Sequence, residues 1–129
     1  MPVSDGFRDF VVEQLEQCTA NVRARRMFGA VGIYAGDDFF AVIDDDRLYF
    51  KVDDQTRPRF EAEGMKPARI TTADGEVMTL GYYEVPLSAL EAPPELKTWV
   101  RDAVAVAQRA AAAKRPRTTR RRSKITNER

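Results

Sequence analysis

The chain has 129 residues, of which 43% are hydrophobic and 32% are charged, which is typical of a soluble globular protein with one domain. It contains no histidine and a single cysteine, Cys18, so it lacks the commonest general base and cannot form an internal disulfide. A structural zinc site is close to excluded. We therefore expect no metal, no cofactor and no enzymatic activity.

The sequence also predicts a cytoplasmic protein without membrane contact. No apolar run approaches the roughly 20 residues that cross a bilayer, and the N-terminus lacks the regions of a signal peptide. The net charge of +1 conceals an asymmetry. Residues 114–129 hold 8 of the 21 bases and 1 of the 20 acids, giving +7, and the remaining 13 bases and 19 acids give −6. An acidic body with a basic tail is predicted.

The first predicted element is a helix. Its apolar residues follow a helical spacing at Phe7, Phe10, Val11, Leu15, Cys18 and Val22. Ser4 or Asp5 can cap it, because either side chain accepts a hydrogen bond from a free N–H of the first turn. Cys18 lies on the apolar face, and we interpret it as a small core residue rather than a reactive thiol.

Three strands are predicted next, over residues 27–35, 39–43 and 48–52. The polar segments between them are too short for parallel crossovers, so the strands form an antiparallel meander. Gly29 and Gly32 lie inside the first strand, where glycine often marks a bulge or a close backbone approach.

A short helix over residues 55–63 follows. Asp54 is its predicted cap, Phe60 its main buried residue, and Gly64 suits the left-handed position after its end.

Two further strands are predicted over residues 68–72 and 77–85, joined by the hairpin signal Asp74-Gly75. Tyr82 and Tyr83 alternate along the second strand, so one ring faces the helices and the other the open sheet face. The outward ring is interpreted as an exposed aromatic or a dimer contact.

Pro93 and Pro94 open the last predicted helix, which runs to Ala113 and is stopped by Pro116. The order α-β-β-β-α-β-β-α predicts an α+β fold, a two-layer sandwich whose five-stranded antiparallel sheet has helices on one face. Residues 1–113 form this domain. Residues 114–129 form a basic tail that we expect to be disordered, because Ile125 is its one large apolar residue.

Several segments of the chain resemble the N-terminal domain of the TfoX/Sxy family. The matching residues are Arg26-Met27-Phe28-Gly29, Gly32-Ile33-Tyr34, Phe40-Ala41-Val42-Ile43, Asp46-Arg47-Leu48-Tyr49-Phe50-Lys51, Phe60, Gly64, Tyr82-Tyr83-Glu84-Val85-Pro86, Leu90, Leu96, Trp99 and Ala103. The resemblance implies a secretion-chaperone-like α+β fold. Longer members of the family regulate competence for DNA uptake as transcriptional coactivators and carry a second, helical domain, in place of which this chain has only its basic tail.

Three motifs between Arg25 and Lys51 imitate functional sites. The glycines are not spaced as in a phosphate-binding loop, and no Gly-Lys-Ser/Thr follows them. The stretch from Arg26 to Tyr34 partly matches the aromatic motif of RNA-binding sheets, but we interpret it as core packing. Asp44-Asp45-Asp46 lacks the spacing of a calcium loop and is interpreted as a solvated turn.

The basic tail is the candidate binding site. Its cations can neutralise phosphates without sequence preference, and they are Lys114, Arg115, Arg117, Arg120, Arg121, Arg122 and Lys124. We predict a non-enzymatic regulatory or interaction module, related to transcription or competence, whose tail contacts DNA or RNA. Its body would bind a protein partner of the transcription machinery or a second copy in a homodimer.

Three alternatives remain at the level of sequence. The first is a small-molecule-binding or enzymatic domain that uses the cleft between sheet and helices. The second is a structural homo-oligomer. In the third, the tail only solubilises the protein or pairs with the acidic body.

Overall fold

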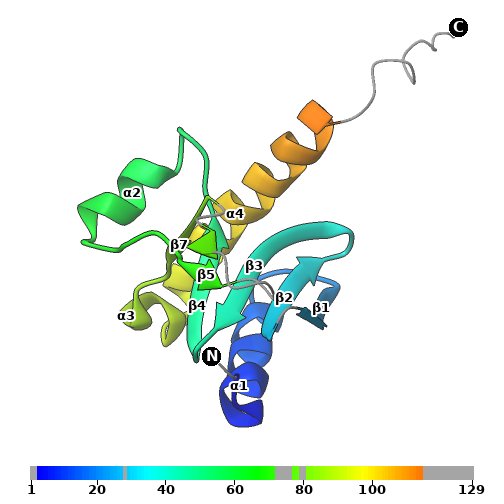
Figure 1. Cartoon of the computed structure of the whole chain (residues 1–129). Helices are drawn as coiled ribbons and strands as arrows, with labels where there is room; N and C mark the ends of the chain where they lie inside the picture. The colour runs from blue at the N-terminus through cyan, green and yellow to red at the C-terminus, as the bar shows by residue number, and fades with distance from the viewer. Residues whose placement is uncertain (1–2, 28, 72–76, 79–80, 115–129) are drawn as a thin grey trace, which may run out of the picture.

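The computed structural model describes residues 3–27, 29–71, 77–78 and 81–114 (Figure 1). One antiparallel sheet of five strands has the order β1 (Val22–Met27), β2 (Ala30–Ala35), β3 (Asp38–Asp44), β4 (Arg47–Lys51) and β7 (Tyr82–Glu84). Strands β5 (Ile70–Thr71) and β6 (Val77–Met78) pair separately with each other. The helices are α1 (Asp5–Glu16), α2 (Arg57–Ala62), α3 (Leu87–Leu90) and α4 (Pro93–Lys114).

The core lies between the five-stranded sheet and the helices. Helix α4 packs against β3 and β4, and α1 packs against α4 and β1. All four helices contribute buried side chains to this layer, which include Leu15, Phe60, Leu90, Leu96 and Val100. The sheet contributes Val31, Ile33, Phe40, Ile43 and Phe50, all fully buried. The predicted α+β sandwich with helices on one face is confirmed.

Helix α1 begins as predicted but ends earlier. The Ser4 hydroxyl accepts a hydrogen bond from the N–H of Phe7 at 3.2 Å, so Ser4 is the N-cap. After the helix, Asn21 adopts the left-handed conformation with φ of 60°, which Asn tolerates better than most residues. The predicted extension of the helix through Cys18 and Val22 is wrong, because Cys18 follows the helix and Val22 begins β1.

The predicted strand over residues 27–35 is also wrong, because it is the end of one strand and the whole of another. Gly29, with φ of 80°, lies between β1 and β2. Strand β1 is at the edge of the sheet and exposes three arginines, Arg23, Arg25 and Arg26. Charged side chains discourage pairing of an exposed edge with other chains, and here they also remove the apolar alternation by which strands are recognised.

The next two turns and strands follow the prediction. Gly36, with φ of 61°, lies between β2 and β3. Asp45 and Asp46, with φ of 54° and 53°, join β3 to β4 in the left-handed conformation that a two-residue hairpin requires.

Helix α2 is shorter than predicted, and the Asp54 cap is wrong. The helix begins at Arg57 after Thr56. Asp53 instead receives the local hydrogen bonds, because its carboxylate accepts from the N–H groups of Gln55 and Thr56. Gly64 has φ of 75°, as expected for the residue that follows this helix.

The predicted strand over residues 77–85 is interrupted at Gly81, whose φ of 70° separates β6 from β7. Within the predicted strand over residues 68–72, residues 68 and 69 lie before β5, and residue 72 lies outside the described residues. The hairpin signal Asp74-Gly75 lies outside the described residues. Helix α3 was not predicted, whereas α4 begins at Pro93 as expected and is described to Lys114.

Candidate functional site

The predicted nucleic-acid-binding residues follow directly from the end of α4. Lys114 is the last residue of this helix, and Arg115, Arg117, Arg120, Arg121, Arg122 and Lys124 lie outside the described residues. In Figure 1 the last turns of α4 project beyond the sheet, away from α1 and α3. The alanines of these turns, Ala111, Ala112 and Ala113, are exposed. The basic sequence is therefore attached at a protruding end of the body.

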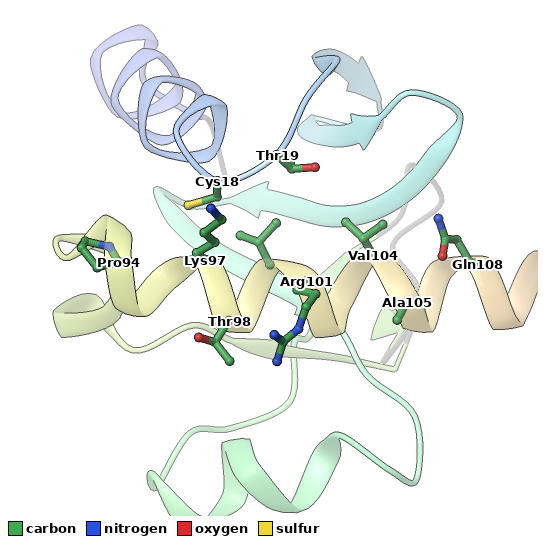
Figure 2. A pocket seen from close by; sticks show the side chains of 10 residues that line it. Cys18, Thr19, Pro94, Lys97, Thr98, Arg101, Val104, Ala105 and Gln108 are labelled. Carbon is green, nitrogen blue, oxygen red and sulfur yellow. The ribbon is translucent and has the colours of Figure 1, made fainter.

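A groove of about 440 Å³ lies along the outer side of α4 (Figure 2). Cys18 and Thr19 form one side, and α4 contributes residues from Pro94 to Gln108. We call this hollow the α4 groove. Over these residues the helix rises about 21 Å.

The α4 groove is basic although the body is acidic. Its cations are Lys97 and Arg101, one helical turn apart, and none of the residues that line it is acidic. Val100 and Val104 supply apolar surface, and Thr19, Thr98 and Gln108 supply polar groups. The groove is suited to an acidic, partly apolar partner. The sequence analysis did not predict this groove. The available signal was the spacing of Lys97 and Arg101, two cations four residues apart on the polar side of α4.

Cys18 does not have the environment of a reactive thiol. Its sulfur lies 3.4 Å from the carbonyl oxygen of Gln14 and 3.7 Å from that of Pro93. Burial raises the pKa of the Cys18 thiol and outweighs the opposing charge of Lys97. A protonated thiol is a poor nucleophile, so a packing role at the edge of the core is favoured.

The other face of the sheet carries aromatic side chains that contact one another. The rings of Tyr34 and Phe39 stack with centroids 5.0 Å apart, and Phe39 lies 6.1 Å from Tyr82. Arg23 lies 5.2 Å over the Tyr34 ring, and Lys51 lies 5.1 Å over that of Tyr82. Bases stack on free ring faces, whereas these faces contact protein groups. The arrangement favours packing over a base-stacking sheet.

Tyr82 and Tyr83 alternate as predicted, but the expectation of an exposed outward ring is wrong. Tyr82 is only 3% exposed, and its backbone oxygen accepts a hydrogen bond from Ala68, which packs in the same cluster. Burial raises the pKa of Tyr82 to about 12. On the helical side, the hydroxyl of Tyr83 donates to Glu61 at 3.0 Å.

The three consecutive aspartates form a turn. Asp45 and Asp46 are exposed, and a carboxylate oxygen of Asp46 accepts a hydrogen bond from the N–H of Ser4 at 2.7 Å. Within the described ranges, no group of three His, Cys, Asp or Glu side chains is placed to hold a metal ion. Through this hydrogen bond the turn between β3 and β4 contacts the start of α1.

Acidic side chains near the C-terminal part of α4 are engaged within the body. Arg109 donates to Asp53 through two nitrogens at 3.0 and 2.7 Å. Burial raises the pKa of Asp53, but the hydrogen bonds from Arg109 and from the Gln55 and Thr56 backbone outweigh it, and the net pKa is lowered. Asp38 accepts a hydrogen bond from Gln108 at 3.0 Å. A tail that folds back here would compete with these contacts.

These features define an α+β two-layer domain with a filled core, whose surface carries a basic groove and a protruding basic segment. The TfoX N-terminal domain matches residues 13–107, from the last turn of α1 through most of α4, and the chain belongs to this family. This confirms the resemblance seen in the sequence. The match ends before the tail. No curated protein matches the chain.

Among the described helices, none combines the length and hydrophobicity that crossing a membrane requires.

Proposed function

We propose that this chain is a non-enzymatic interaction module of the cytoplasm whose basic tail contacts nucleic acid and whose acidic body binds protein. The observation that carries the proposal is the division of charge, with +7 in residues 114–129 and −6 in the rest of the chain. The positive net charge of the tail attracts phosphates, whereas the negative net charge of the body repels them. We therefore expect the tail to be the main contact with nucleic acid, where release of counterions supplies the binding free energy.

The position of α4 supports this division. Its last turns project beyond the sheet, away from α1 and α3, so the tail begins at an exposed end of the body. A body that binds a protein partner and a tail that binds phosphates together join that partner to DNA or RNA. This arrangement fits the role in transcription or competence that the family resemblance implies.

An interaction module is favoured over an enzyme or a small-molecule receptor in the sheet–helix layer. Fully buried side chains such as Ile33, Phe40 and Phe50 fill the space between the sheet and α4. The α4 groove lies on the outer side of the helix. The absence of histidine from the sequence removes the commonest acid–base group.

Fluorescence anisotropy with labelled duplex DNA and single-stranded RNA, across salt concentrations, tests the proposal. The full chain is compared with a tail variant, Arg120→Gln/Arg121→Gln/Arg122→Gln. The matched control neutralises three exposed bases of the body, Arg25→Gln/Lys66→Gln/Arg69→Gln. Each lost phosphate contact on B-DNA should reduce the log–log salt slope by about 0.9, so the tail variant should lose up to about 2.7.

The control should retain the slope of the unmodified chain. Binding that is independent of salt, or an equal loss in both triple variants, would show that the tail is not the contact surface. Absence of binding to either nucleic acid at low salt would reject the proposal.

A further inference from the structure

Helix α1 presents an acidic outer face. Val11 and Leu15 are buried on its inner side, whereas Asp9, Glu13 and Glu16 are exposed on the opposite side. Asp9 lies 3.3 Å from Arg8. No ion pair joins Glu13 or Glu16 to another residue in the part of the chain that the structure describes. Two carboxylates one turn apart are thus available to a partner.

Phe10 lies at the edge of this acidic face and is 36% exposed. It and Leu87 are the large hydrophobic side chains exposed among the described residues. One partly exposed aromatic ring therefore lies next to the available carboxylates of α1.

The α4 groove offers the complementary surface. Lys97 has no ion pair with any described carboxylate, and Arg101 has only its neighbour Asp102, at 3.7 Å. Both cations are exposed, and Val104 lies one turn beyond Arg101 on the same side of the helix. In Figure 2 the side chains of Lys97 and Arg101 both extend from α4, and that of Lys97 points toward Cys18.

The two surfaces match in spacing and length. Residues three or four apart on a helix lie about 5–6 Å from each other, so Glu13 and Glu16 have nearly the separation of Lys97 and Arg101. Helix α1 has 12 residues and is about 18 Å long, while the α4 groove extends for about 21 Å. We infer that two copies of this chain form a symmetric dimer in which the outer face of each α1 lies in the α4 groove of the other.

Symmetry favours a second copy as the occupant over an unrelated acidic peptide. Helix α1 packs against α4, and Cys18 and Thr19, which follow α1, border the groove. Both halves of the interface therefore lie side by side on one molecule, which is what a two-fold contact requires. Two helix contacts form an interface at the small end of the specific range, so we expect a micromolar dissociation constant. The inference does not depend on contact with nucleic acid.

Sedimentation velocity of the full chain from about 1 to 500 µM, at low and high salt, tests the dimer. Two variants reverse one surface each: Glu13→Lys/Glu16→Lys and Lys97→Glu/Arg101→Glu. Each should weaken dimerisation at least about tenfold, because like charges then face each other. An equimolar mixture should form heterodimers at wild-type concentrations, because the basic α1 of one variant meets the acidic groove of the other and the reverse pair also matches.

The control Asp54→Lys/Glu63→Lys changes the net charge of the exposed surface near α2 by the same amount as the α1 variant and should dimerise as the wild type does. The tail variant Arg120→Gln/Arg121→Gln/Arg122→Gln should also dimerise normally, although it loses nucleic-acid binding. A wild-type chain that stays monomeric throughout, a mixture that does not restore dimers, or dissociation by the tail variant instead of the reversals would overturn the inference. Far-UV circular dichroism confirms that each variant is folded.

Discussion

Replacing Phe60 with alanine tests how α2 is held to the body. Phe60 is 3% exposed, and its ring meets Trp99 edge-on with centroids 4.8 Å apart and Tyr83 at 6.0 Å. A helix of six residues is not stable alone, so its packing against the body keeps it formed. Phe60 is the buried residue of this helix.

The expected cost follows from the area that is lost. Phe→Ala removes roughly 100–150 Å² of buried apolar surface, about 2.5–4 kcal/mol at 25 cal/mol per Å². Two contacts remain after the substitution, since Arg59 lies 3.9 Å over the Trp99 ring and 3.2 Å from Asp102. Both are partly exposed and contribute little, so we expect Phe60→Ala to lower the free energy of unfolding by about 3 kcal/mol.

Urea denaturation followed by tryptophan fluorescence measures this effect. Trp99 is the single tryptophan of the chain, and its buried Nε1 has no hydrogen-bond partner in the described structure, so entry of water should change its emission. Leu87→Ala, at a residue 61% exposed, is the control and should cost within about 0.5 kcal/mol. A loss below about 1 kcal/mol for Phe60→Ala would refute the reasoning.

Two further predictions concern the backbone and Tyr82. Gly6→Ala should stabilise the protein by about 0.5 kcal/mol, because Gly6 lies in α1 with open space around the added Cβ. Gly36→Ala should instead destabilise it by about 1 kcal/mol, because Gly36 has φ of 61°. The two substitutions should shift Tm in opposite directions, and shifts of the same sign would contradict the prediction. The pKa of Tyr82 is raised from 10.0 to about 12, so the stability that its protonated form provides is complete below about pH 10 and is lost as the pH rises to about 12. Urea unfolding should show a fall of roughly 2–3 kcal/mol over this range, and Tyr82→Phe should largely remove it; an unchanged pH dependence in that variant would exclude Tyr82 as the source.

Much of the fold could be predicted because its core follows regular patterns. Leu48 and Phe50 are buried on the helical side of β4 and alternate with less buried residues. Along α4, the buried residues Leu96, Trp99, Val100 and Ala103 repeat at helical spacing. Such patterns arise from burial on one face and need no knowledge of the partner element.

The errors have a common physical origin. Asn21, Gly29 and Gly81 end or separate elements by adopting positive φ, and a glycine inside an apolar run fits a turn as well as a strand. Only pairing with other strands decides between them. Strand β1 was missed because an edge strand can be made of arginines, whose side chains follow no apolar alternation.

The two candidate sites also differ in whether the sequence alone predicts them. The tail was found because composition alone distinguishes a run of bases. The α4 groove was not, because it exists only where the chain after α1 comes to lie beside α4. Cations that face a groove have the same sequence pattern as cations that face solvent.

Helix α4 connects the proposed dimer contact to the proposed nucleic-acid contact, because its inner side, its outer side and its end serve different parts of the structure. Its inner side, with Leu96 and Trp99, completes the core, and its outer side carries Lys97 and Arg101 in the α4 groove. Its end leads into the basic tail. The groove cations lie toward the start of the helix and the tail begins at its far end, so a partner in the groove leaves the tail accessible. A dimer joined through α1 and the α4 groove would therefore present two tails to one nucleic acid, and the second contact would be strengthened by the first.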